Sequence, residues 1–163
     1  MSTTRPARPT DADALLALQT ALDAESELML LEPGERESAP DDLRARLESD
    51  HASYLLVAEG NGELAGYAEV SVLPYARARR TGYVVMGVRA AYSGKGLGRA
   101  LLGAARDEAA RRGLRRLELT VMTHNLRALN LYLSCGFELE GLRRNALVVG
   151  DRAVSEYYLG LLL

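Results

Sequence analysis

The chain has 163 residues, 48% hydrophobic and 26% charged, a composition typical of a soluble globular domain with one core. Its formal net charge of −2 argues against a general affinity for nucleic acid or for an anionic membrane surface. Cys135 is the only cysteine, which excludes an intramolecular disulfide, and His51 and His124 lack the spacing of metal ligands. We therefore expect one cytoplasmic domain over residues 1–163, with no metal, nucleic-acid or membrane partner.

The first third of the sequence predicts a strand, two helices and a long connection between the helices. The strand is expected over Thr3–Arg8, and a helix with leucines at helical spacing follows it. Prolines, a glycine and charged residues make Glu25–Pro40 irregular, and its apolar patch suits it to cover a cleft. The second helix is expected over Asp41–Glu48.

The middle of the sequence predicts three strands. Tyr54–Ala58 and Leu64–Leu73 read as strands joined by a tight turn at Asn61-Gly62, a dipeptide favoured in two-residue hairpins. Tyr83–Val88 is an apolar, β-branched run, which indicates a buried central strand.

The last part of the sequence alternates helices and strands. A helix is predicted over Lys95–Arg112, a strand over Arg116–Val121 and a helix over Asn125–Ser134, before a hairpin of Leu139–Val149 with Ala153–Leu162. Because hairpins and helical crossovers both occur, we predict an α/β (α+β) fold. It should be a three-layer αβα sandwich, in which a mixed, mostly antiparallel sheet of about six to seven strands carries helices on both faces.

The glycine run Ser93-Gly94-Lys95-Gly96-Leu97-Gly98 joins the predicted central strand to the next helix. Glycine at every second position lets the backbone turn sharply and approach a ligand closely. The helix beginning near Lys95 then offers free N–H groups and the positive end of its dipole to an anion. The spacing of a Walker A loop and that of a dinucleotide-binding motif are both absent, so the run predicts a phosphate or pyrophosphate site of another kind.

A second motif follows in Asn125–Phe137, NLRALNLYLSCGF. Asn125, Ala128, Leu129 and Tyr132 share one face of the predicted helix. The small alanine leaves room on that face for a ligand chain. The Asn125 amide and the Tyr132 phenol could form hydrogen bonds with this chain at two positions along the helix.

Together these residues resemble the GNAT superfamily, the GCN5-related N-acetyltransferases. Val88–Leu102 is similar to that family's acetyl-CoA-binding motif, and Asn125–Phe137 is similar to its second cofactor-side motif. The order of the predicted elements matches across essentially the whole chain. The resemblance implies a single N-acetyltransferase domain over residues 1–163, which uses acetyl-CoA as co-substrate and no metal.

The resemblance also implies roles for individual residues. Backbone groups of Met86 and Val88 would pair with the pantetheine arm, and the Val88 N–H would polarise the thioester carbonyl. Asn125 would contact the pantetheine arm, and Tyr132 would donate a proton to the departing thiolate. Backbone N–H groups would hold the pyrophosphate, from Ser93, Gly94, Lys95, Gly96, Leu97, Gly98 and Arg99.

One position departs from the family pattern, and one role has no assigned residue. The family's pyrophosphate loop usually begins with Arg or Gln, and this chain has Ser93 there. The acceptor amine must lose a proton before attack, since an alkyl ammonium has a pKa of about 10.4. The base that takes this proton is left open between water and four carboxylates, Glu32, Glu35, Glu69 and Glu118.

The resulting hypothesis is direct acetyl transfer from acetyl-CoA to a primary amine of a small molecule or of a peptide or protein N-terminus. A non-catalytic acyl-CoA-binding module of the same fold is the alternative, and an ATP-binding protein is a weaker one. The apolar end Leu159–Leu163 either completes a core strand or joins a second copy in a homodimer. The basic stretches Arg77–Arg80 and Arg111–Arg116 are interpreted as solvated surface.

Overall fold

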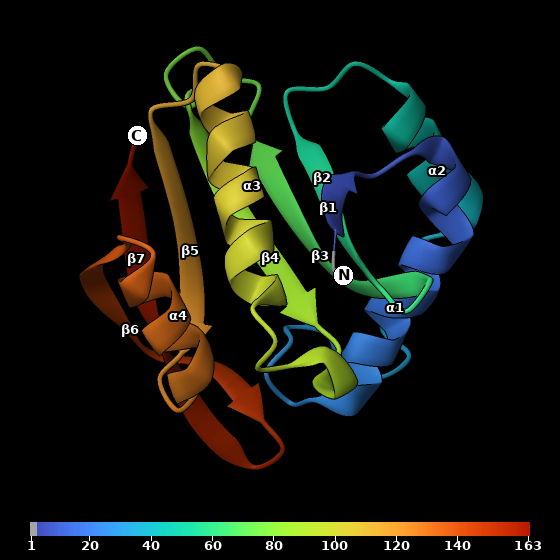
Figure 1. The fold of residues 1–163 in the computed structure, drawn as a ribbon. Helices are drawn as coiled ribbons and strands as arrows, with labels where there is room; N and C mark the ends of the chain where they lie inside the picture. The colour runs from blue at the N-terminus through green and yellow to red at the C-terminus, as the bar shows by residue number, and fades with distance from the viewer. Residues whose placement is uncertain (1–2) are drawn as a thin grey trace.

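The computed structural model describes residues 3–163 and is built on one seven-stranded sheet with the order β1-β2-β3-β4-β5-β7-β6 (Figure 1). Every neighbouring pair is antiparallel except β4 and β5, which run parallel. The strands are β1 (Thr3–Pro6), β2 (Tyr54–Gly60), β3 (Glu63–Val72), β4 (Thr81–Val88), β5 (Arg116–Met122), β6 (Glu138–Val149) and β7 (Arg152–Leu162). The predicted mixed, mostly antiparallel sheet is confirmed.

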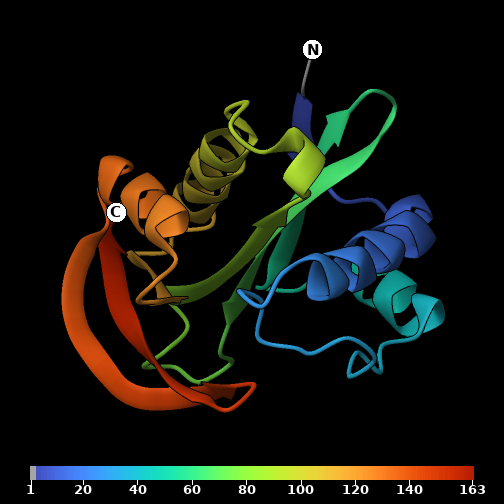
Figure 2. The ribbon, with the colours of Figure 1, turned by 90° about the horizontal axis from the view of Figure 1, so that it is seen from below.

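Four helices cover the two faces of this sheet (Figure 2). They are α1 (Ala12–Glu25), α2 (Pro40–Glu48), α3 (Leu97–Arg111) and α4 (Leu126–Ser134). Apolar residues of α3 and α4 pack with one face of the sheet, and those of α1 and α2 pack with the opposite face. Two cores on either side of one sheet form the three-layer sandwich that the sequence predicted.

The glycine run delays the start of α3. The helix was expected from Lys95 but begins at Leu97, because Gly94 and Gly96 have φ of +74° and +82°. These left-handed conformations are open to glycine and lie outside the right-handed helix. The run is therefore a loop of turns and bends that leads into the first turn of α3, and a short 3₁₀ turn at Ala90–Tyr92 precedes it.

Strands β4 and β5 pair only at the beginning of each strand. Thr81, Gly82 and Tyr83 are in register with residues 116–118, and no pairing follows beyond them as far as Val88 and Met122. We call the region beyond this point the split. It opens in the centre of the sheet, toward the end at which the glycine run follows β4.

The last strand, β7, lies inside the sheet between β5 and β6. Leu159 is fully buried, so this part of the apolar C-terminal segment completes the core, whereas Leu162 is 77% exposed. A homodimer through this segment stays a prediction. Within residues 3–163, no helix combines the length and the apolar character needed to cross a bilayer.

Candidate functional site

The split exposes a row of backbone groups from each strand that borders it. On β4, the Arg89 N–H donates to the Ala65 carbonyl at 2.8 Å, and the β3–β4 register makes Gly87 and Val85 bond to β3 in the same way. Antiparallel ladders alternate, so Val84, Met86 and Val88 direct their N–H and C=O groups away from β3, toward β5. An extended ligand chain inserted in the split would meet these groups as a neighbouring strand would.

The β5 side of the split also exposes backbone N–H and C=O groups that pair with no neighbouring strand. The Thr123 N–H donates to the Ser155 carbonyl at 3.0 Å, which continues the alternating β5–β7 ladder. By the same alternation, the backbone groups of Thr120 and Met122 point toward β4. The site thus has unpaired polar backbone on both walls, which a buried sheet centre avoids unless a ligand supplies partners.

The glycine run presents six consecutive free donors at the mouth of the split. None of the N–H groups of residues 94–99 donates a hydrogen bond to another of the residues 3–163, and the first bond into the helix runs from the Ala100 N–H to the Gly96 carbonyl at 3.0 Å. Free N–H groups at the start of a 15-residue helix form an anion site with a favourable dipole. Gly94, Lys95, Gly96, Leu97, Gly98 and Arg99 carry these free N–H groups, and their binding of a pyrophosphate stays a prediction.

Ser93 differs from the residues that follow it. Its N–H donates to the Ala90 carbonyl at 3.1 Å, closing the 3₁₀ turn, so this N–H is not available to an anion in the structure. Lys95 is exposed, with its ammonium 3.1 Å from the Ala91 carbonyl and 5.3 Å from the centre of the Tyr92 ring. It can swing toward an anion bound at the helix start because neither contact is buried.

Tyr132 projects from α4 into the core that α3 and α4 share with the sheet. It is 8% exposed, and its ring centre lies 6.0 Å from that of Phe137 at an interplanar angle of 56°. Burial raises the pKa of its phenol well above the usual value, with a smaller contribution from Tyr83. The phenol is therefore a proton donor that stays protonated at neutral pH.

The Tyr132 hydroxyl forms no hydrogen bond with any of the residues 3–163. The same residues contain no fully buried side-chain oxygen or nitrogen that lacks a partner. The hydroxyl oxygen therefore keeps a small solvent-accessible area, although the ring that carries it is buried. An unpartnered hydroxyl on a buried ring is suited to meet a ligand atom.

Asn125 is the N-cap of α4 rather than part of its first turn. Its Oδ1 accepts a hydrogen bond from the Ala128 N–H at 3.3 Å, which fixes the start of the helix. This bond leaves the side-chain NH₂ group free of the cap. The residue therefore combines a structural role with a donor that can serve a ligand.

Tyr83 and Thr120 are site residues that the sequence analysis did not find. The Tyr83 hydroxyl lies 2.7 Å from Thr120 Oγ1, which joins β4 to β5 where the two strands part. The register places both side chains on the face opposite α3 and α4. Next to them, Val85 is 37% exposed in the middle of the central strand, so that face is open at the split.

The four carboxylates proposed as bases fall into two groups. Glu69 and Glu118 lie on strands near the split, and each is held by an arginine, Arg46 at 2.6 Å and Arg116 at 2.9 Å. Glu32 and Glu35 are exposed in the connection before α2, where a Glu35 oxygen accepts the Glu32 N–H at 2.8 Å. The structure thus separates two strand carboxylates from two loop carboxylates.

A groove of about 300 Å³ between α3 and α4 also escaped the sequence analysis. The Arg99 guanidinium donates to Ser134 Oγ at 2.8 Å and ties the first turn of α3 to the end of α4 across it. The groove is lined by Arg99, Leu102, Gly103, Arg106, Ser134, Cys135, Phe137 and Leu161. No motif could reveal it, because it depends on how two helices pack.

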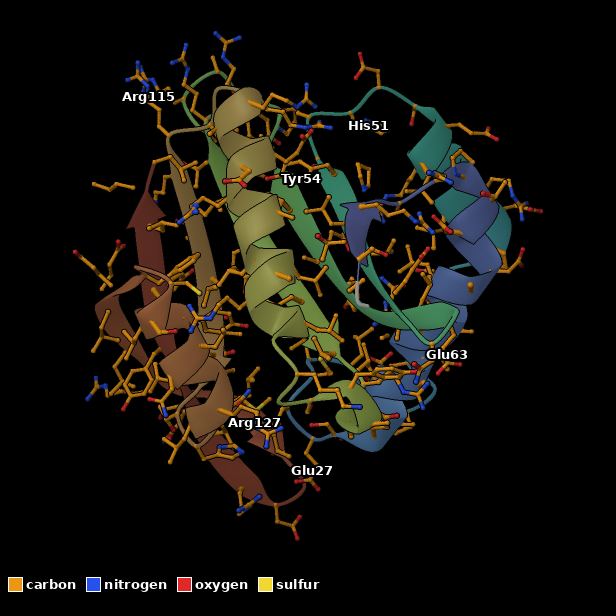
Figure 3. The ribbon with its side chains drawn as sticks, in the orientation of Figure 1. Glu27, His51, Tyr54, Glu63, Arg115 and Arg127 are labelled. Carbon is orange, nitrogen blue, oxygen red and sulfur yellow. The ribbon has the colours of Figure 1, made fainter. Side chains whose placement is uncertain are left out.

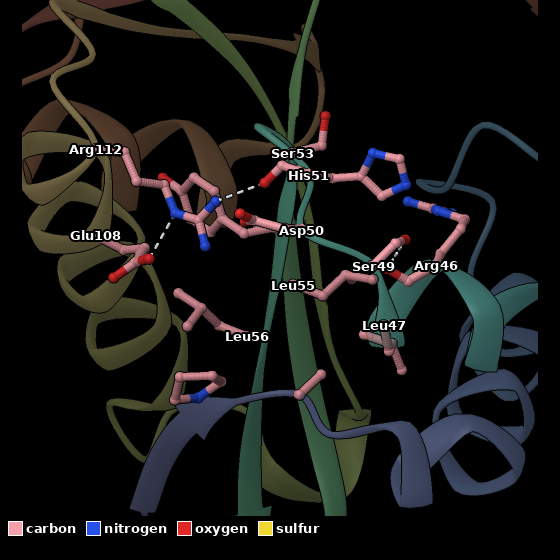
Figure 4. A pocket seen from close by; sticks show the side chains of 13 residues that line it. Arg46, Leu47, Ser49, Asp50, His51, Ser53, Leu55, Leu56, Glu108 and Arg112 are labelled. Carbon is pink, nitrogen blue, oxygen red and sulfur yellow. Dashed lines mark hydrogen bonds and ion pairs between the residues drawn. The ribbon is translucent and has the colours of Figure 1, made fainter.

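A smaller pocket of about 120 Å³ lies at the other end of α3 (Figure 4). Its Arg112 stacks over the Tyr54 ring and donates to the His51 carbonyl at 2.8 Å. A helix of 15 residues separates this pocket from the glycine run by about 22 Å. It contains none of the predicted site residues. Among residues 3–163, no group of three or more His, Cys, Asp or Glu side chains is arranged to hold a metal ion.

Comparison with known proteins agrees with this geometry. The family model of the acetyltransferase (GNAT) family matches residues 19–137. An N-alpha-acetyltransferase of Mycobacterium tuberculosis, RimI, is 43% identical over 98 residues, which are 60% of each chain. The chain spans 60 to 65% of the length of the curated relatives it matches.

Solved structures show the same fold over the whole chain. A GNAT-family acetyltransferase from Streptococcus pneumoniae has a TM-score of 0.95 at 28% identity, with complete coverage of both chains. The YncA protein of Salmonella typhimurium, solved with its cofactor acetyl-CoA, has a TM-score of 0.87 at 26% identity over 100% of this chain and 94% of that one. These matches define the class of the protein as an acetyltransferase. The chain belongs to the acetyltransferase (GNAT) family.

Proposed function

We propose that this protein is an N-acetyltransferase that moves an acetyl group from acetyl-CoA directly to a primary amine of a small molecule or of a peptide or protein N-terminus. The observation that carries this proposal is the split, which opens beside six free N–H groups. The split suits an extended chain that contains amide groups, and the free N–H groups suit a pyrophosphate. Coenzyme A contains both. Family membership and the acetyl-CoA-bound Salmonella relative support the same assignment.

The pyrophosphate, the pantetheine arm and the thioester of acetyl-CoA each have matching groups in this chain. The N–H groups of residues 94–99 would bind the pyrophosphate through the backbone. Met86 and Val88 would pair with the amides of the pantetheine arm, and the Val88 N–H would polarise the thioester carbonyl. The Asn125 amide would contact the same arm from α4. The thioester supplies the acetyl group when the co-substrate is bound.

The chemistry needs one proton acceptor and one proton donor. The acceptor ammonium loses a proton, its nitrogen forms a bond with the thioester carbon, and the carbon–sulfur bond breaks. Tyr132 donates its phenolic proton to the departing sulfur and regains one from the new amide nitrogen. Water, Glu69 or Glu118 would take the first proton, since these two carboxylates lie on strands near the split.

A transfer screen tests this function. The protein is incubated with acetyl-CoA and a panel of amines, amino acids, antibiotics and peptides with free N-termini, and the release of free thiol is measured. Amine-dependent thiol release with formation of the acetylated amine supports the proposal. Tight acetyl-CoA binding without turnover on any amine would instead favour the non-catalytic acyl-CoA-binding module.

The pH dependence of transfer should reflect the amine rather than Tyr132. Because burial raises the pKa of Tyr132 above its usual value, the protonated phenol persists in alkaline solution. We expect kcat/KM for the amine to rise with pH as the amine deprotonates, with no decline up to about pH 9.5. Initial rates across this range measure it. An alkaline decline with an apparent pKa below about 9 would mean that a different acid acts in transfer.

Replacing Ser93 with arginine should tighten acetyl-CoA binding. A guanidinium at the start of the glycine run can form charge-assisted hydrogen bonds to the pyrophosphate, and we expect a fall in Kd of about fivefold by calorimetry. Ala110→Arg, an exposed position near the end of α3, adds the same charge far from the loop and should leave Kd unchanged. No gain with Ser93→Arg would show that the backbone donors alone determine affinity.

A further inference from the structure

The fold joins two arginine stretches that are far apart in the sequence. The loop after β3 contains Arg77, Arg79 and Arg80, and Arg115 follows α3. The Arg115 N–H donates to the Arg80 carbonyl at 2.8 Å, immediately before the point where β4 and β5 begin to pair. Side chains ending in nitrogen gather around Arg115 where these two segments meet (Figure 3).

These four arginines, which we call the arginine patch, are exposed and have no acidic partner. None of them forms a side-chain hydrogen bond or an ion pair with any of the residues 3–163. The neighbouring arginines do form ion pairs: Arg111 and Arg112 share Glu108, and Arg116 is paired with Glu118 and Glu140. The patch is thus a concentration of uncompensated positive charge on a chain whose net charge is −2.

Apolar side chains accompany this charge. Leu73 is 59% exposed and Tyr75 is 69% exposed, both in the same loop just ahead of the arginines. An apolar pair beside guanidinium groups offers a partner both ion pairs and buried contact area, the combination found at protein interfaces.

The size of the patch favours a protein partner over nucleic acid. Single-stranded nucleic acid is held along a continuous basic groove of several nucleotides. Here the basic surface ends at Arg116, where Glu118 and Glu140 are present, so a longer polyanion would meet like charge. A short acidic segment of a protein can instead place its carboxylates on the guanidinium groups and an apolar side chain on Leu73 and Tyr75.

We propose that the arginine patch, with Leu73 and Tyr75, is a docking surface for a carboxylate-rich segment of another protein. The patch lies at the end of α3 remote from the glycine run, about 22 Å along the helix. A partner bound there leaves the split and the free N–H groups accessible. Docking and acetyl-CoA binding can therefore occur together, and the proposal goes beyond the acetyl-transfer function without depending on it.

Fluorescence anisotropy with defined probes tests the proposal. The probes are a labelled peptide of about twelve residues that alternates acidic residues with leucine, its Asn/Gln counterpart, and a single-stranded RNA of similar length. We expect the acidic peptide alone to bind, with weaker binding as salt is raised. The variant Arg77→Gln/Arg80→Gln should weaken its binding about tenfold, a loss of about 1.4 kcal/mol.

A matched control separates the patch from general charge. Arg8→Gln/Arg144→Gln removes the same charge at two exposed arginines outside the patch, and we expect less than about a twofold change. Both double variants should keep the thermal midpoint and acetyl-CoA affinity of the parent chain, which verifies their folding. Equal weakening by the two pairs, binding of the RNA in preference to the peptide, or no binding of the acidic peptide would each overturn the proposal.

Discussion

Replacing Tyr132 with phenylalanine should lower kcat for acetyl transfer by about 100-fold, the magnitude typical of losing a positioned general acid. The ring contact with Phe137 survives the change, and the hydroxyl that is lost has no partner among residues 3–163. Stability and acetyl-CoA affinity should therefore stay within about twofold of the parent values, since only the proton donor is removed. Steady-state kinetics and calorimetry on the same preparation measure both quantities.

The control for this change is Tyr75→Phe. Tyr75 is 69% exposed in the loop before β4, and removal of its hydroxyl leaves the split untouched. We expect its kcat to equal that of the parent chain. If Tyr132→Phe turned over acetyl-CoA at the same rate as Tyr75→Phe, Tyr132 would have no part in the mechanism and water would be the proton donor.

Replacing Gly96 with alanine should weaken acetyl-CoA binding by about tenfold or more, which corresponds to about 1.4 kcal/mol. Gly96 has φ of +82° and lies directly before the first turn of α3. A Cβ there meets no atom within 4 Å, so the cost is backbone strain of about 1–2 kcal/mol rather than a clash. Relief of that strain turns the neighbouring N–H groups away from the position where they converge.

Gly113→Ala is a matched control for this strain. Gly113 follows the other end of α3 and has φ of +76°, and a Cβ at this position would likewise meet no atom within 4 Å. Urea unfolding should show a similar loss of stability in both variants, whereas calorimetry should show weaker acetyl-CoA binding only in Gly96→Ala. Equal affinity in the two variants would contradict the assignment of the glycine run as the pyrophosphate site.

The sequence was sufficient for the order of the elements and for locating the loop whose N–H groups are free, whereas the binding of a cofactor there stays a prediction. The glycine spacing led to the free donors of residues 94–99, because glycine permits the left-handed turns that keep residues 94–96 out of the helix and leave the N–H groups of the loop and of the first helical turn unpaired. It could not show that the Ser93 N–H closes a 3₁₀ turn with Ala90, or that the left-handed Gly96 delays the helix to Leu97. Boundaries of this kind depend on single dihedral angles.

The face of the sheet opposite α3 and α4 was much less predictable, because its contacts join distant parts of the chain. Tyr83 meets Thr120 only through the register of two strands, although the residues are 37 positions apart in the sequence. Glu69 is paired with Arg46 from a helix that precedes it in the sequence, so its charge could not be judged from its neighbours. Side-chain pairing between elements is fixed by packing, and a local pattern does not encode it.

The split gives this sheet two edges in its interior, where sheets normally have none. A strand edge at the rim of a sheet can recruit a strand from another molecule, which is a route to aggregation. Here α3 and α4 cover one face of the sheet, and β3 and β7 pair with the outer sides of the parted strands, so the two inner edges are enclosed on more sides than an edge at the rim. This enclosure limits the routes by which another chain can reach the unpaired backbone groups, which a strand at the rim of a sheet leaves open to any neighbour.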